Sequence, residues 1–446
     1  MKPSGSIRAA GTRTPRPPEE SSISINTILF WAAVCLGILF TIAPLLPLRF
    51  VDVFLLSTPL FRRVSTSVCS SGLGAGLRVA ERFCSASHLQ VRTMASSGAP
   101  YAWERRIAEL AVQRAAVLTK AVYTARVKGT VTKSDKSPVT IADFGAQALV
   151  FGALERNFPA DNIIGEEDSG DLRTNSDLTS LVWDVVSTAL AETQGLEGDL
   201  GTVSGQSQML EFIDKGACAN SATGRVWALD PVDGTKGFLR GGQYAIALAL
   251  LVDGVVQVGV LGCPNLPGLD GGEEGVILSA VRGQGTTVKP LSADLDKTEP
   301  RKTTINAISS ASEASFCEGV ESGHSAHDVQ ARIATTLGIT KPSVQLDSQA
   351  KYASIALGRG ELYLRLPVSM TYEEKIWDHA AGNIIVEEAG GVVADMYGRP
   401  IDFTVGRTLK ENKGMIAMPK QVSEEVMKVV REIAVEHYGP PPKSSL

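Results

Sequence analysis

Apolar residues recur with two different spacings in this chain, and the spacings predict helices first and strands afterwards. In residues 103–126, apolar side chains such as Ile107 and Leu118 belong to a pattern repeated every three or four positions, which is typical of a helix face. Residues 144–157 continue with a helical pattern that ends just before Pro159. We therefore expect two helices at the start of the globular part of the chain.

The middle of the chain carries strand patterns. Residues 226–230 form a short apolar run, and 244–262 hold two β-rich runs around Asp253-Gly254, a dipeptide typical of a tight hairpin. A further strand and turn are expected over 275–285. Before these strands, residues 170–225 are rich in Gly, Ser and Thr, and we expect a variable loop with a helical patch at 207–215.

After residue 303, strand and helix patterns alternate. Predicted strands cover 304–309, 343–346, 361–366 and 391–394, and predicted helices cover 326–337, 349–357 and 378–389. This order predicts an α+β sub-domain at 101–300 and an α/β sub-domain at 301–440. Two layered sub-domains of this kind are expected to meet at a cleft.

Residues 1–100 are unlike the rest of the chain. The first twenty are rich in Pro, Gly, Ser and Arg, a composition typical of disorder. Residues 27–48 then contain no charge and are long enough to cross a bilayer as a helix. Residues 49–99 are rich in Ser and Arg, as mitochondrial leaders are, and Met94 resembles a second start. A membrane anchor, a targeting leader and an over-extended gene model therefore stay open for residues 1–93.

The distribution of charge and cysteine narrows the class of protein. Residues 1–100 carry ten Lys/Arg and four Asp/Glu, whereas the other 346 residues carry 33 and 44, a net charge of −11. An acidic body of this kind is unsuited to general nucleic-acid binding and is suited to gathering cations. The six cysteines form no C-x-x-C pair, which argues against a zinc site and a disulfide framework.

The stretch DPVDGTK, residues 230–236, combines two close carboxylates with a glycine turn. Pro231 stiffens the turn and brings Asp233 back beside Asp230, where the two carboxylates repel unless a cation lies between them. Oxygen ligands of this type select Mg²⁺, which also favours sites that include substrate phosphate. Gly234 permits a close backbone approach, and Lys236 adds a positive charge. A plain surface turn remains the alternative for this stretch taken alone.

Three further segments each place an acid where a site or an ordinary structural role is possible. Glu166 begins the acidic run in IIGEEDSG (163–170). If this run has no role in a site, it is a solvated turn. Asp143 in SPVTIADFGAQ and Asp378 in IWDHAAGN stand near predicted helix starts, where each is otherwise an N-cap. His379, beside Asp378, is more simply explained as a packed histidine.

Together these segments resemble the inositol monophosphatase superfamily of Mg²⁺-dependent, lithium-sensitive phosphatases. The resemblance rests on WALDPVDGT and WDHAAGNIIVEEAGG and covers residues 101–436. The runs SDKSPVTIADFGAQ, DGTKGFLRGG, HSAHD, LDSQAKY and YLRLP are similar to those of its 3′(2′),5′-bisphosphate nucleotidases, especially the fungal and plant type. The implied fold is a layered αβαβα sandwich, of the inositol monophosphatase and fructose-1,6-bisphosphatase type, with two sub-domains flanking a metal cleft.

The resemblance also implies roles for individual residues. Two or three Mg²⁺ ions are expected on Glu166, Asp230, Val232 through its carbonyl, Asp233 and Asp378. Asp143 and Thr235 are expected to orient and activate the attacking water. Substrate contacts are expected from Gly234, Thr235, Lys236, His324, Ser348, Lys351 and Arg365. Ser348 and Lys351 are predicted to lie one helical turn apart, so that both reach one ligand.

The expected reaction is hydrolysis of adenosine 3′,5′-bisphosphate to AMP and phosphate, with 3′-phosphoadenylyl sulfate as a second substrate. Two alternatives stay open: a phosphatase of inositol phosphates or sugar phosphates, and a non-catalytic, membrane-tethered nucleotide sensor. We expect a monomer that binds no nucleic acid. Its catalytic body is expected in the cytoplasm, or in mitochondria if residues 1–93 are a leader.

Overall fold

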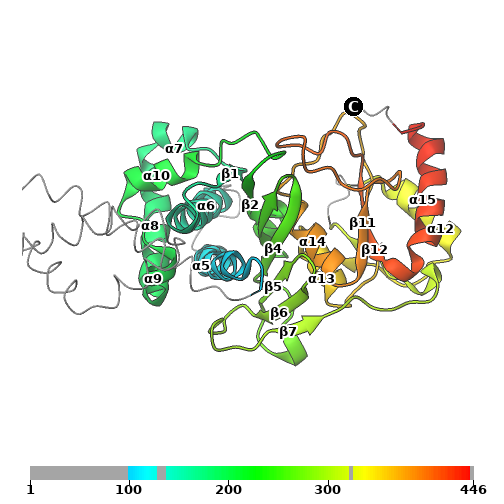
Figure 1. The fold of residues 1–446 in the computed structure, drawn as a ribbon, viewed down its shortest axis with the longest axis horizontal. Coiled ribbons are helices and arrows are strands. Elements are labelled where there is room, and N and C mark those ends of the chain that lie inside the picture. Colours follow the sequence, from blue (N-terminus) through cyan, green and yellow to red (C-terminus); the bar gives the residue numbers. More distant parts are fainter. Residues whose placement is uncertain (1–98, 128–136, 321–324, 442–446) are drawn as a thin grey trace, which may run out of the picture. The chain divides into compact units, whose positions relative to one another are not determined.

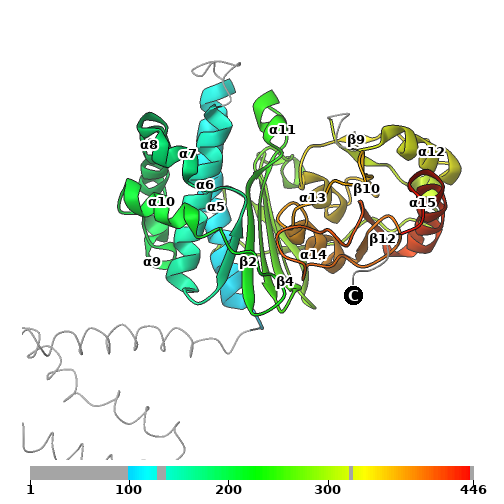
Figure 2. The same ribbon diagram turned by 90° about the horizontal axis from the view of Figure 1, so that it is seen from above.

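Helices and sheets alternate in five layers (Figures 1 and 2). The computed structural model describes residues 99–127, 137–320 and 325–441. The first layer holds α5 (Ala102–Val127) and α6 (Ser137–Asn157), and the second is a seven-stranded sheet. The third layer holds α13 (Ala350–Ala356) and α14 (Ala380–Glu388). A three-stranded sheet and an outer helical pair complete the order, so the predicted αβαβα sandwich is confirmed.

The large sheet follows the chain, since its strands lie in the order β1 to β7. The strands are β1 (Asn162–Gly165), β2 (Arg225–Asp233), β3 (Ala245–Val252), β4 (Val255–Cys263), β5 (Val276–Val281), β6 (Gly285–Pro290) and β7 (Arg301–Thr303). β1 pairs with β2 in parallel, and each later pair is antiparallel. The predicted hairpin is confirmed: Asp253 and Gly254 both have positive φ, as its two-residue turn requires.

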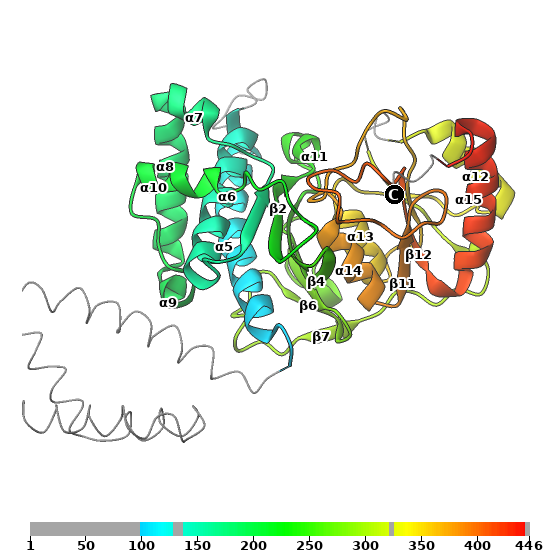
Figure 3. The ribbon, with the colours of Figure 1, turned by 45° about the horizontal axis from the view of Figure 1, so that its top comes forward.

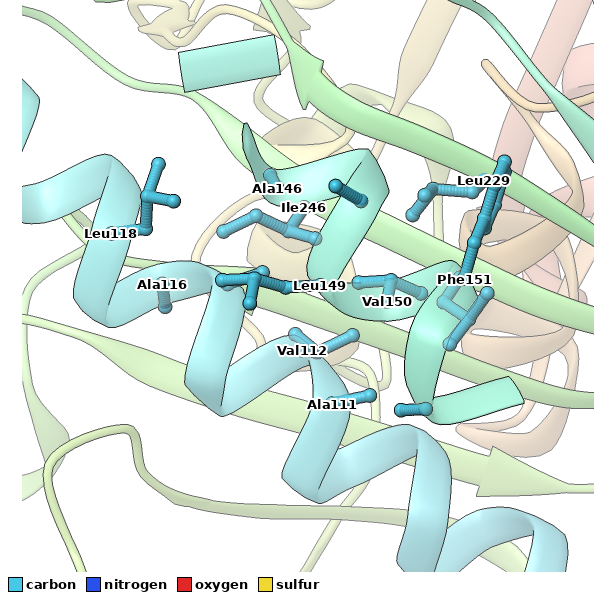
Figure 4. Close-up of a cluster of buried hydrophobic side chains, with 14 of the residues drawn as sticks. Ala111, Val112, Ala116, Leu118, Ala146, Leu149, Val150, Phe151, Leu229 and Ile246 are labelled. Carbon is cyan, nitrogen blue, oxygen red and sulfur yellow. The ribbon is translucent and has the colours of Figure 1, made fainter. Parts of the chain in front are cut away.

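Each face of this sheet is buried by helices. On one face, side chains of α5 and α6 such as Val112 and Leu149 meet Leu229 and Ile246 of the sheet (Figure 4). On the other face, α13 and α14 pack against β4, and alternate residues of the same strands supply the contacts. Burial on both sides explains why β3 reads as one continuous apolar run.

The second sheet lies farther along the chain. β10 (Tyr363–Arg365), β12 (Met415–Pro419) and β11 (Gly391–Ala394) pair in that order, all antiparallel. The outer helices α12 (His327–Leu337) and α15 (Ser423–Tyr438) pack against it and against each other. A short parallel pair, β8 (Cys317–Glu318) with β9 (Val344–Gln345), leads back toward α13.

Residues 170–225 differ from the predicted loop, although the helical patch predicted at 207–215 is confirmed. They form four helices that extend the first layer (Figure 3). These are α7 (Gly170–Thr174), α8 (Ser176–Glu192), α9 (Glu197–Leu200) and α10 (Gln206–Asp214). Val182 and Val186 are fully buried in the same core as α5 and α6. The abundance of Gly, Ser and Thr hid this helical spacing in the sequence.

Two other predictions need correction or completion. Residues 304–309 are not a strand: the ladder ends at Thr303, and the Ile305 N–H instead donates to the carbonyl of Ala389. β12 and α15 were not predicted, although every residue of β12 is buried and α15 buries one of its faces. β6, β8 and the short helix after β2 were not predicted either, and α6 begins seven residues before the predicted position 144. The other predicted helices and strands lie close to their predicted positions. The described part of the chain contains no helix that is both long and apolar enough to span a membrane, and segment 27–48 lies outside it.

Candidate active site

The four acidic segments meet at one end of the large sheet. Gly165 of β1 pairs with Leu229 of β2, so the next residues, Glu166 and Asp230, leave the two parallel strands side by side. Between Asp230 and Asp233 the pairing with β3 shifts register, a bulge that lets both side chains serve the same end of the strand. The strand itself continues to Asp233, three residues beyond the predicted end.

Asp143 and Asp378 reach this cluster from two different layers. Asp143 is the seventh residue of α6, which begins at Ser137, so it is no N-cap. Asp378 stands two residues before α14, where His379 occupies the N-cap position. The N-cap interpretation is therefore wrong for both aspartates, and both side chains are available for another role.

The cluster holds more negative charge than a protein interior tolerates. Burial raises the pKa of Asp230 well above its usual range, and the nearby carboxylates, led by Glu166 and Asp233, add to the effect. Burial also raises the pKa of Asp143, with further contributions from Glu167 and Glu166. Oδ1 of Asp143 and Oδ1 of Asp230 are buried and have no hydrogen-bond partner among the described residues. Unpaired carboxylate oxygens at this density fit a hard divalent cation.

Gly234 allows the turn after Asp233 to lie close to the segment that carries Ser348. It has φ +92°, which favours glycine, and a Cβ there would lie 2.8 Å from Cβ of Ser348. Ser348 itself has φ +63° and precedes α13, so the predicted helical turn between Ser348 and Lys351 is wrong. Both side chains nevertheless line the same cavity.

Gln349 is a structural residue of the site that the sequence analysis missed. Its backbone N–H donates to Oδ2 of Asp233 at 2.6 Å, and its side-chain Nε2 donates to the carbonyl of Trp377 at 2.9 Å. Its Oε1 accepts from the Gly382 N–H at 3.0 Å. Through its backbone and its side chain, this one buried residue ties Asp233 to the start of α14.

The acids open into a cavity of about 290 Å³. Its lining includes the predicted residues Glu166, Asp230, Val232, Asp233, Gly234, Thr235, Lys236, Ser348, Lys351, Arg365 and Asp378. Asp347, Gln349, Tyr352, Tyr363 and Tyr372 also line it and were not predicted. Asp143 lies beside the acids rather than in this lining, and His324 lies outside the described residues. Tyr352 and Tyr363 could have been suspected from LDSQAKY and YLRLP, which place them near the predicted cations Lys351 and Arg365, whereas Tyr372 lies in neither run.

Two cations line the same cavity as the acids, and the charges of both act on Asp233. Burial lowers the pKa of Lys351 to about 8, although the charge of Asp233 opposes the shift. Its Nζ lies 5.1 Å from the centre of the Tyr363 ring, a favourable cation–π position. Arg365 donates from Nε to Oε1 of Glu374 at 2.8 Å. The cavity therefore has an acidic wall suited to cations and a basic wall suited to anions.

This chain is similar to known proteins in sequence and in structure. The model of the inositol monophosphatase family matches residues 101–434. A 3′(2′),5′-bisphosphate nucleotidase of Emericella nidulans is 51% identical over 350 residues, covering 75% of this chain and 99% of that protein. One of Schizosaccharomyces pombe is 48% identical over 339 residues, covering 74% and 95%. Among solved structures, an inositol monophosphatase from Zymomonas mobilis is 19% identical with a TM-score of 0.49, covering 75% of this chain and 99% of that one.

Proposed function

Because this chain belongs to the inositol monophosphatase family, we propose that it is a 3′(2′),5′-bisphosphate nucleotidase. It removes the 3′-phosphate of adenosine 3′,5′-bisphosphate to give AMP and phosphate, and it accepts 3′-phosphoadenylyl sulfate in the same way. The observation that carries the proposal is the position of Lys351 and Arg365 in the lining of the cavity that also holds the acids. A monoester has one phosphate to bind, whereas a bisphosphate needs positively charged side chains for a second phosphate as well.

The acidic wall is proposed to hold two or three Mg²⁺ ions through Glu166, Asp230, Asp233, Asp378 and the carbonyl of Val232. Mg²⁺ held there supplies positive charge to phosphate oxygens and makes water more acidic. Lithium inhibition is expected if Li⁺ takes one of these places. The unpaired oxygens of Asp143 and Asp230 support a cation at this position.

The remaining residues are proposed to handle the proton and the substrate. Asp143 takes a proton from the attacking water on a carboxylate oxygen, and the Thr235 hydroxyl orients that water. Lys351 and Arg365 hold the second phosphate, and Ser348, which lies against Gly234, contacts the substrate in the same cavity. His324 is proposed to contact the nucleoside. Membrane anchoring by residues 27–48, a monomeric state and the location in the cell stay predictions.

The identity of the product tests the proposal. The full chain, incubated with adenosine 3′,5′-bisphosphate and MgCl₂, is expected to give adenosine 5′-monophosphate, as resolved by chromatography from the 3′-isomer. Release of the 5′-phosphate would contradict the proposal that the acids act on the 3′-phosphate while Lys351 and Arg365 hold the other phosphate. Tight binding without turnover would instead favour the nucleotide sensor, and turnover confined to inositol 1-phosphate would favour the inositol phosphatase.

A further inference from the structure

Glu374 is a buried acid beside the site that has no role in the proposed reaction. It lies in the segment between β10 and α14 and is 5% exposed. Its two carboxylate oxygens contact different groups. Oε1 accepts from Nε of Arg365 at 2.8 Å, and Oε2 lies 3.2 Å from Nε2 of His379.

The contacts continue from Glu374 to the cavity wall. Nδ1 of His379 lies 2.9 Å from the hydroxyl of Tyr352, and Tyr352 lines the cavity. Burial lowers the pKa of His379, which favours a neutral ring. In a neutral ring, Nε2–H donates to Glu374 and Nδ1 accepts from the Tyr352 hydroxyl. Glu374 thus joins two routes that both end at the cavity, one through Arg365 and one through His379 and Tyr352.

The charge of Glu374 is maintained despite its burial. Burial alone would raise its pKa, but the hydrogen bond with His379 and the charge of Arg365 outweigh burial and bring the pKa to about 2. The Glu374 contact uses Nε of Arg365 and so fixes the plane of the guanidinium. An arginine held in this way is preorganised for an anion in the cavity.

A metal-binding role for Glu374 is the competing explanation. Ligand atoms of Glu374, Asp378 and His379 all lie within 4.8 Å of one another. However, both oxygens of Glu374 already have partners, and one partner is a guanidinium, which repels a cation. The arrangement therefore fits an anion-orienting role better than metal ligation.

We propose that Glu374 is a positioning residue for substrate selectivity: it orients Arg365 toward the second phosphate and links Arg365, through His379, to the segment that carries Asp378. The inference rests on the proposed function, because Arg365 needs a second phosphate to recognise. It assigns to Glu374 an effect on the bisphosphate that is absent for a monoester.

The test compares adenosine 3′,5′-bisphosphate with adenosine 3′-monophosphate, which lacks the 5′-phosphate. Glu374→Gln keeps the shape and removes the charge, so the KM for the bisphosphate should rise about tenfold, as expected for a weakened charge-assisted contact. The kcat for the bisphosphate and both constants for the monoester should change less than about twofold. Glu373→Gln is the matched control, since this exposed neighbour accepts a hydrogen bond from the Thr408 hydroxyl and does not line the cavity, and it should leave all constants unchanged.

A double-mutant cycle with Arg365→Lys separates positioning from general structural damage. If Glu374 acts through Arg365, Glu374→Gln should have little further effect in the Arg365→Lys background. An equal effect in both backgrounds, or an equal loss on both substrates, would overturn the inference while leaving the proposed function intact. A wild-type chain with no preference for the bisphosphate would instead overturn the proposed function itself.

Discussion

Lys351 is the residue that most directly separates a bisphosphate site from a monoester site. Its substitution by Met keeps the length of the buried side chain and removes the charge. The kcat/KM for adenosine 3′,5′-bisphosphate should fall about 10- to 100-fold, because a hydrogen bond to a charged group contributes about 1.5–3 kcal/mol. Activity on adenosine 3′-monophosphate should persist. Steady-state kinetics on both substrates provide the measurement.

Lys289→Met is the control for that experiment. Lys289 is also buried, but its Nζ donates to the carbonyl of Leu295 and it does not line the cavity. The Lys289→Met variant should leave unchanged the ratio of the activities on adenosine 3′,5′-bisphosphate and adenosine 3′-monophosphate. Equal losses on both substrates in Lys351→Met would contradict the assigned role.

Asp143 is expected to act in catalysis and to destabilise the folded chain in EDTA. Asp143→Asn should lower kcat about 10²- to 10⁴-fold, the usual contribution of a general base, with a small change in KM. The same substitution should raise the melting temperature in EDTA at pH 8, because it removes a buried carboxylate whose Oδ1 has no partner among the described residues. A variant with unchanged kcat would exclude Asp143 as the base.

At the scale of elements, the turn between β2 and α11 (Thr235–Arg240) depends on one glycine. Gly234→Ala should lower both kcat/KM and the free energy of unfolding, the latter by about 1–3 kcal/mol, because it adds backbone strain and a clash with Ser348. Urea titration and steady-state kinetics measure the two effects.

Gly283→Ala separates strain from the clash. Gly283 has φ +78° in the turn between β5 and β6, and a Cβ there would meet no other side chain or backbone atom of the described residues within 4 Å. This control should lose some stability and keep full activity. If Gly234→Ala behaved in the same way, the close approach to Ser348 would have no functional importance.

The elements that the sequence predicted well have strong local signals. The hairpin around Asp253-Gly254 and the helix over 103–126 need only their own residues to be recognised. The predicted strand at 304–309 and the predicted loop at 170–206 were wrong because the structure there depends on tertiary partners. The ladder ends where the Ile305 N–H bonds to Ala389, and Val182 is buried in the same core as α5 and α6.

At the scale of the whole molecule, the acids of the site could be predicted but not their supports. Segments such as DPVDGTK carry a recognisable composition, so the cluster was expected from the sequence. Gln349 bonds to Trp377, 28 positions away, and Glu374 bonds to Arg365, 9 positions away. The sequence around Gln349 and Glu374 does not indicate these contacts. The separation into sub-domains 101–300 and 301–440 stays a prediction.

The acid cluster should also make stability depend on pH when no metal is present. The pKa values of Asp143 and Asp230 are raised, and burial raises that of Glu167 to about 7. The folded chain then holds protons that the unfolded chain releases near pH 4, so this contribution to stability is present at low pH and is lost as the pH rises. In EDTA, the melting temperature should fall between about pH 5 and pH 8.

Added MgCl₂ should remove most of that fall, since bound cations stabilise the ionised acids. Scanning calorimetry at several pH values, with EDTA or MgCl₂, provides the measurement. A melting temperature that rises toward pH 8 in EDTA, or that ignores MgCl₂, would contradict the proposed metal site.

The most direct test of the central claim is phosphate release by the full chain from adenosine 3′,5′-bisphosphate and from inositol 1-phosphate, each with MgCl₂, with EDTA and with added LiCl. We expect release from the bisphosphate that requires Mg²⁺ and is inhibited by Li⁺, with little release from the inositol ester. Preferential hydrolysis of inositol 1-phosphate would contradict the account, because Lys351 and Arg365 would then have no second phosphate to bind.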